Sequence, residues 1–169
     1  VSTIHRHIGE IHSLQKDYST ALGYLQNAIE SISNDFDQST IYKNPVLEQI
    51  FDRVNALKAL VLKARTFLQY YEQITCAPRD LEMAHNTYQL AAGLIDALKQ
   101  EFIAEGSKEF LVGNAKTVYE GLIYTSLLLN QQKISVTQNT EYSSNDYKNA
   151  AFGFAEKGKA TLLLAALKD

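Results

Sequence analysis

Cysteine and proline are scarce in this chain, and tryptophan is missing altogether. Among its 169 residues are one Cys and two Pro. A lone cysteine excludes an internal disulfide framework and any metal site that needs several thiolates. The scarcity of proline leaves room for long uninterrupted helices, and 46% hydrophobic residues suffice for one folded domain with its own core.

A marked excess of charge and long apolar runs are also lacking. The formal net charge is −3, and Lys and Arg are scattered along the chain. Proteins that bind nucleic acid usually carry a basic patch, so we expect no nucleic-acid partner. No stretch approaches the roughly 18 consecutive apolar residues of a membrane span. We therefore expect no membrane partner and a cytoplasmic location.

The first thirty-odd residues carry the most informative pattern in the sequence. Small and aromatic residues fall at offsets that fit two packed helices, 2–14 and 18–33: Ile8, Gly9, His12, Asp17, Tyr18, Ala21, Leu25 and Ala28. A glycine in the first helix lets the second approach closely, and alanines in the second helix have the same effect. Asp17 is placed to cap the second helix.

Apolar stripes with alternating spacings of three and four predict four further helices. We expect them at 45–72, 81–104, 108–131 and 145–167, with polar loops at 34–44 and 132–144. Pro45 suits a first helical turn, Asp80 is expected to cap the fourth helix, Gly106 to end it and Ser107 to cap the fifth. Val61 and Ile95 are expected to be buried where the third and fourth helices pair.

The hairpin pattern resembles the tetratricopeptide repeat, a helix-turn-helix unit of about 34 residues. Ala84, Tyr88 and Ala91 repeat the positions of Ala21, Leu25 and Ala28. The resemblance implies an all-α fold, a right-handed α-solenoid of stacked antiparallel helix hairpins with about six helices. We expect one helical-repeat domain over 1–169 with units 1–33, 45–104 and 107–169. Because the chain begins and ends inside helical patterns, we expect it to be part of a longer protein.

A second resemblance lies at the C-terminal end. The stretch Ala-Phe-Gly-Phe-Ala-Glu-Lys-Gly-Lys-Ala at 151–160, followed by Leu162, Leu163 and Leu167, resembles the final repeat of bacterial CHAT-domain proteins. In that family a tetratricopeptide array precedes a caspase-like protease domain. Over 44–169 the resemblance implies a bacterial scaffold or sensor region beside an enzyme domain that this chain lacks. Cys76 and His85 match no motif of that protease, so no catalytic residue is carried over.

Histidine and cysteine supply the only hints of site chemistry. His5 and His7 point in different directions on a helix, and His5 and His12 are too far apart for easy joint ligation. We interpret these side chains as packed or half-buried, and Cys76 as a loop residue. The carboxylates are spread over outer helical faces. We therefore expect no catalytic residues, no metal and no cofactor, although an enzyme that uses His and Cys76 remains the alternative from another class.

Surface residues of the odd-numbered helices are the candidate partner-binding residues. On the first helix the inner-surface offsets give Thr3, Arg6, Glu10 and Ser13, and Glu10 would repel a carboxylate ligand. Among the ten tyrosines, Tyr70, Tyr71, Tyr119 and Tyr124 are placed to line a groove. Tyrosine is favoured at interfaces because its ring buries area while its hydroxyl finds a partner. The partner-binding set is Arg6, Glu10, Ser13, Tyr70, Tyr119 and Tyr124.

Two functions fit this sequence. The first is a non-catalytic scaffold that binds a peptide or protein segment along the inner faces of the first, third and fifth helices. The alternative is an intramolecular regulatory arm for a downstream caspase-like domain of the same polypeptide. The last helix ends in an apolar run at 161–167, which predicts weak self-association through that helix.

Overall fold

Helices make up most of the part of the chain that the computed structural model describes, which is residues 1–36, 39–101, 105–136 and 144–166. Within these ranges no strand forms, and the one extended contact is an isolated bridge between Ser33 and Ile50. The prediction of an all-α fold is confirmed. The elements are α1 (Ser2–Leu14), α2 (Tyr18–Glu30), the short η1 (Leu47–Gln49), α3 (Arg53–Tyr70), η2 (Tyr71–Thr75), α4 (Pro78–Glu101), α5 (Glu105–Val136) and α6 (Ser144–Ala166).

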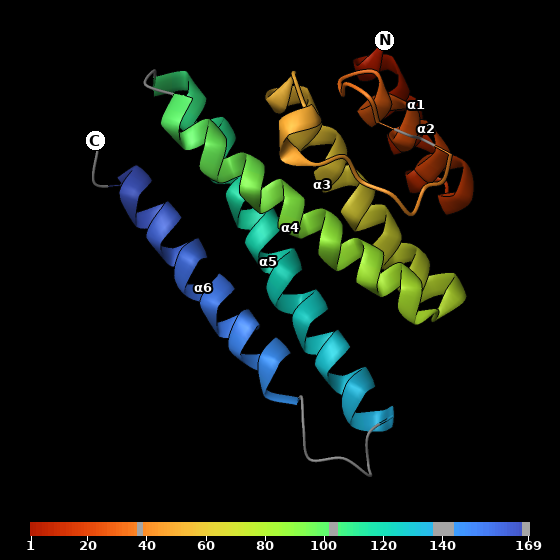
Figure 1. Ribbon diagram of the computed structural model, residues 1–169, viewed down its shortest axis with the longest axis vertical. Coiled ribbons are helices and arrows are strands. Elements are labelled where there is room, and N and C mark those ends of the chain that lie inside the picture. Colours follow the sequence, from red (N-terminus) through yellow and green to blue (C-terminus); the bar gives the residue numbers. More distant parts are fainter. Residues whose placement is uncertain (37–38, 102–104, 137–143, 167–169) are drawn as a thin grey trace.

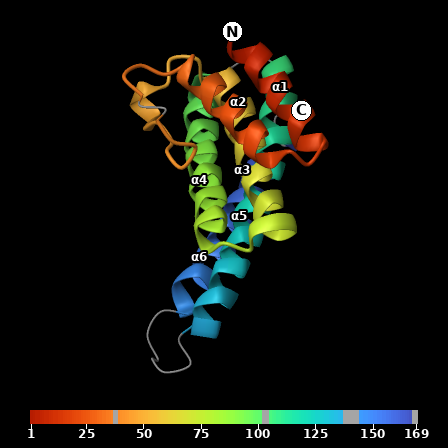
Figure 2. The same ribbon diagram turned by 90° about the vertical axis from the view of Figure 1, so that its right-hand side faces the viewer.

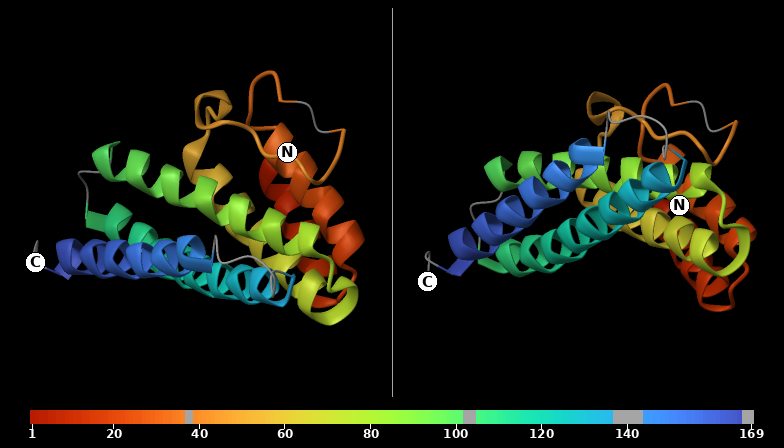
Figure 3. Two further views of the ribbon diagram at one scale, coloured as in Figure 1. Left: turned by 60° about the horizontal axis from the view of Figure 1, so that its bottom comes forward. Right: turned by 90° about the horizontal axis from the view of Figure 1, so that it is seen from below.

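Consecutive helices pack against each other as hairpins (Figure 1). In addition, α3 contacts both α1 and α5, so these three helices lie side by side. Helix α6 packs on α5 and lies at the opposite side of the molecule from α1 (Figures 1 and 3). The arrangement is a stack of helical hairpins with α3 near its centre.

The first hairpin is held by the close approach that its small residues predict. A Cβ atom added at Gly9 would lie 2.8 Å from Cγ of Leu25 and 3.1 Å from the carbonyl oxygen of Ala21. Leu25, Ala21 and Ala28 are completely buried. The Asp17 carboxylate accepts a hydrogen bond from the backbone amide of Thr20, as expected of a cap. The pattern in the first thirty residues thus describes the packing of α1 against α2 correctly.

Helix α3 forms the centre of the core and is covered on most sides. Leu57, Leu60 and Phe67 of α3 are fully buried, and Ile95 of α4 packs in the same core. The expected burial of Ile95 is confirmed, whereas Val61 is only partly buried at the edge of the core.

The beginning of the third helix differs from the prediction. Helix α3 begins at Arg53 rather than at Pro45, because Asp52 caps it by accepting from the amide of Asn55. The chain before it forms the short η1 and is tied to the residues after α2 by the bridge between Ser33 and Ile50. Figure 2 shows this segment between α2 and α3 (orange) as a long connection beside the helices. Tertiary contacts therefore override the helix-starting tendency of Pro45.

The boundaries of α4 and α5 also need correction. Helix α4 begins at Pro78, so Asp80 lies inside its first turn instead of capping it. The Asp80 carboxylate accepts hydrogen bonds from the hydroxyls of Tyr42 and Thr75. Helix α5 already includes Gly106 and Ser107, and it extends through part of the expected polar loop to Val136. The remainder of that loop, 137–143, lies outside the described residues.

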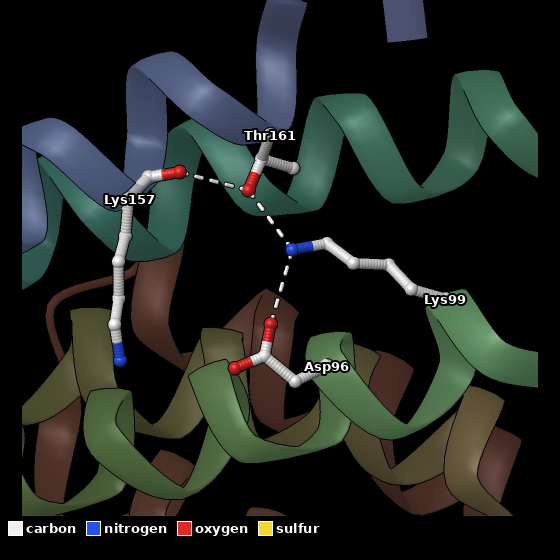
Figure 4. Close-up of polar contacts among 4 residues, drawn as sticks. All are labelled: Asp96, Lys99, Lys157 and Thr161. Atoms are coloured by element: carbon white, nitrogen blue, oxygen red, sulfur yellow. Dashed lines mark hydrogen bonds and ion pairs between the residues drawn. The ribbon is translucent and has the colours of Figure 1, made fainter. Parts of the chain in front are cut away.

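A polar contact between side chains ties α6 to α4 across the α5–α6 hairpin. The ammonium of Lys99 donates to Thr161 Oγ1 at 2.9 Å and to Asp96 Oδ1 at 3.0 Å (Figure 4). The Thr161 hydroxyl donates to the backbone carbonyl of Lys157, one turn earlier in α6. Helix α6 is therefore positioned by α4 as well as by α5.

Candidate functional site

Three helices that lie side by side form one continuous surface, which we name the α1–α3–α5 face. Ser13 of α1 lies 3.4 Å from Gln69 of α3, and the Tyr124 hydroxyl of α5 donates to Glu72 at 2.7 Å. These bonds join the three helices along one side of the stack. Its exposed or half-buried side chains are Arg6, Glu10, Arg65, Gln69, Glu72, Glu120 and Tyr124.

The centre of this face combines a cation, a carboxylate and two tyrosines. Tyr124 is 46% exposed and contacts the exposed Glu72, and Arg65 is exposed on the same side about two helical turns before Glu72. The hydrogen bond to Glu72 is the main cause that raises the pKa of Tyr124. Beneath the surface, burial raises the pKa of Tyr88 to about 12, and the charges of Arg65 and Glu72 act on it with opposite signs. At neutral pH both phenols are protonated and able to donate a hydrogen bond.

Tyr88 reaches this position from α4 because α5 carries a glycine beneath it. A Cβ atom at Gly121 would lie 2.4–2.8 Å from three atoms of the Tyr88 ring. The ring therefore lies directly on the α5 backbone. Gly121 thus allows α4 and α5 to approach closely.

The candidate residues of α1 are only partly available. Arg6 and Glu10 form an ion pair at 3.8 Å, and Arg6 Nη2 also lies 2.6 Å from Nε2 of the neighbouring His7. Both side chains are half-buried at the edge of the α1–α3–α5 face. The charge of Arg6 is therefore already paired with that of Glu10.

Two of the sequence-predicted partner-binding residues are buried in the chain's own core. Ser13 is 7% exposed, and its hydroxyl lies 3.1 Å from that of Thr66 in α3. Tyr119 is 3% exposed and packs against Gly158 of α6. Both residues join helices and offer no surface to a partner. Tyr70 is half-buried and packs with Tyr18 at a ring distance of 6.0 Å, so only Tyr124 of the tyrosines in the partner-binding set is well exposed.

Three polar residues of α3 and of η2, which continues it, were missed by the sequence analysis. Arg65, Gln69 and Glu72 follow one another at spacings of four and three, so they lie on one side of the helix. They interrupt two apolar stripes that cover the rest of α3. These three polar residues, together with Tyr124 of α5, are the signal in the sequence that would have located the centre of the α1–α3–α5 face.

A second polar cluster lies in the core, where Lys63 of α3 is fully buried. Its ammonium donates to Gln26 Oε1 at 2.6 Å, to the Lys43 carbonyl at 2.8 Å and to Asn44 Oδ1 at 2.9 Å. All three acceptors are uncharged, and burial lowers the pKa of Lys63 to about 7. The cluster fastens the segment between α2 and α3 to the core, because Asn44 also donates to Thr87 of α4.

The histidines occupy structural positions in the part of the chain that the structure describes. His12 stacks on Tyr24 at 5.6 Å, and its Nδ1 lies 3.2 Å from the Asp17 carboxylate. His85 is buried, contacts the Thr125 hydroxyl at 2.9 Å through Nδ1, and has its pKa lowered by burial. Among the described residues, no three His, Cys, Asp or Glu side chains come together to hold a metal ion.

Cys76 is exposed and has a left-handed backbone, with φ 48°. Residues with a Cβ atom pay roughly 1–2 kcal/mol in this conformation, while glycine does not. We predict that Cys76→Gly raises the unfolding free energy by about 0.5–1 kcal/mol in urea denaturation. Cys76→Ser is the matched control and should leave it unchanged. A loss of stability in the Gly variant would show that the Cys76 side chain contributes more than its conformation costs.

Comparison with protein-family models, with curated proteins and with solved structures found no significant match for this chain. The resemblances to tetratricopeptide and CHAT-associated repeats therefore stay predictions. Among the described helices, none combines the length and the apolar character that crossing a membrane requires.

Proposed function

We propose that the protein is a non-catalytic scaffold that binds a peptide or protein segment on its α1–α3–α5 face. The observation that carries the proposal is the centre of that face, where exposed Tyr124 donates a hydrogen bond to exposed Glu72 and exposed Arg65 lies on the same side about two helical turns earlier. Arg and Tyr are among the residue types that contribute most to binding energy in protein interfaces. The hydrogen bond from Tyr124 to Glu72 fixes both side chains before a partner arrives.

The helical framework supports binding by preorganisation. The face is built from side chains on three helices that buried contacts hold together, such as the hydroxyls of Ser13 in α1 and Thr66 in α3. A ligand that binds there orders little of the receptor, so less binding energy is lost to conformational entropy. An acidic side chain in the ligand would pair with Arg65, and an apolar one would pack on the Tyr124 ring.

The test is a random peptide library displayed on phage and selected on the chain. Binding of an enriched synthetic peptide is then measured by calorimetry with Arg65→Glu, Tyr124→Ala and the control Asn86→Glu on the exposed side of α4. We predict a loss of affinity of about tenfold or more for the first two variants and no change for the control. Failure to enrich any peptide, or equal losses in all three variants, would contradict the proposal.

A further inference from the structure

Helix α1 carries apolar side chains on the side that faces away from α2 and α3. Ile4 and Ile11 are 63% and 54% exposed, Val1 and Leu14 are also exposed, and Ile8 is half-buried. Spacings of three and four place Ile4, Ile8 and Ile11 in one stripe along the helix. Four exposed large apolar residues within fourteen positions form a patch of the kind that marks an interaction site.

The packing around α3 shows which elements cover both sides of a helix inside the stack. Helix α3 is covered on one side by the α1–α2 hairpin and on the other by α4 and α5. Helix α1 has α2 and α3 on one side only. The apolar stripe of α1 therefore lies on the side that corresponds to the side of α3 covered by the α1–α2 hairpin.

Helix α6 carries an exposed stripe of its own at the opposite end of the stack. Phe152 and Leu163 are 70% and 60% exposed, and they lie three turns apart on the same side of the helix. Between them lie Glu156 and Lys159, whose side chains pair at 3.1 Å. Leu167, which the sequence analysis assigned to the apolar end of this helix, lies outside the described residues.

The register of α6 matches that of α2, which covers α3 inside the stack. In α2, small or apolar residues face α1. The residues that directly follow them in the sequence are buried on the side of α3; these are Leu22, Gln26 and Ile29. In α6, Ala151 and Gly158 face α5, and the following positions are Phe152 and Lys159. The exposed stripe of α6 thus continues an interface that the chain already forms between α2 and α3.

We infer that two copies of this chain associate head to tail, with the α6 stripe of one copy on the α1 stripe of the next. The two stripes are different, and the helices that carry them, α1 and α6, lie at opposite sides of the molecule (Figure 1). The contact is heterologous, so it leaves one α1 stripe and one α6 stripe open and extends into longer chains at higher concentration. This association is independent of ligand binding to the α1–α3–α5 face.

Sedimentation velocity over a concentration series tests the inference with two double variants. Ile4→Glu/Ile11→Glu disables the α1 stripe, and Phe152→Glu/Leu163→Glu disables the α6 stripe. The control, Asn86→Glu/Gln89→Glu, places the same charges on exposed positions of α4. Circular dichroism and melting curves establish that each variant is folded as the unmodified chain is.

The unmodified chain and the control are expected to form dimers and larger species as concentration rises. Each double variant alone is expected to stay monomeric, and an equal mixture of the two is expected to form dimers and nothing larger. Restoration by mixing is specific to a heterologous contact, because each variant keeps one intact stripe. A monomeric unmodified chain, a mixture that stays monomeric, or an α6 variant that still dimerises alone would overturn the inference.

Discussion

Replacing Gly121 with Ala is expected to destabilise the protein strongly. The added Cβ atom would lie 2.4 Å from Cζ of Tyr88, well inside van der Waals contact. Tyr88 is 3% exposed and its ring is rigid, so either α4 and α5 must separate or the ring must move. Overpacking of this kind typically costs about 1–3 kcal/mol, which exceeds the gain of up to about 1 kcal/mol that Ala brings to a helix.

Gly113 of the same helix provides the matched control. A Cβ atom added there meets nothing within 4 Å, so Gly113→Ala is expected to stabilise the protein through helix propensity alone. Because the helix-propensity gain is common to both variants, we predict that their unfolding free energies, measured in urea, differ by the overpacking cost of about 1–3 kcal/mol. In a Tyr88→Leu background the cost of Gly121→Ala should largely disappear. Equal effects at both glycines would mean that Tyr88 does not lie on α5.

The second large effect concerns pH and the buried Lys63. In the unfolded chain its pKa is close to the ordinary 10.5, whereas burial lowers it to about 7 in the folded protein. Between these values the unfolded state binds more protons, so the free energy of unfolding rises with pH. The contribution of Lys63 to this free energy is greatest above its pKa in the unfolded chain and is lost as the pH falls toward 7. From pH 7 to pH 9 we predict a gain of about 2 kcal/mol from this residue.

Urea denaturation of the natural chain and of Lys63→Met at both pH values measures this contribution. The variant removes the titrating group and keeps a long apolar side chain, so its stability should change less between pH 7 and pH 9. The difference between the two slopes isolates Lys63 from other groups that titrate in the same range. Parallel slopes would show that the three oxygen acceptors keep the pKa of Lys63 near its ordinary value.

Periodicity along the sequence predicts the helices well because it depends on local spacing. The stripes of α3 and α4 follow from apolar residues three and four apart, and Gly9 with Leu25 predicts how α1 meets α2. The beginning of α3 could not be predicted in this way. After Pro45 the chain forms the short η1, and the bridge between Ser33 and Ile50 ties it to the end of α2; such a tertiary contact leaves no local signal.

The centre of the candidate site was predicted only in part for the same reason. Tyr124 was identified from its residue type, but its partner Glu72 lies 52 positions away. Tyr119 has the same residue type and is buried, because α6 packs over it. Which tyrosine faces solvent depends on the neighbouring helices, and a single sequence does not contain that information. Arg65 was overlooked because a lone cation on a helix usually indicates only a solvated surface.

Binding of a partner segment across α1, α3 and α5 is the central claim, and nuclear magnetic resonance tests it most directly. A peptide selected on the chain is titrated into isotopically labelled protein, and changes in the backbone amide signals are mapped onto the structure. We predict that the largest changes cluster around Arg65, Glu72 and Tyr124, with none at Asn86 or Gln89 of α4. Changes centred on the exposed side of α4, with the signals of Arg65 and Tyr124 unmoved, would contradict it.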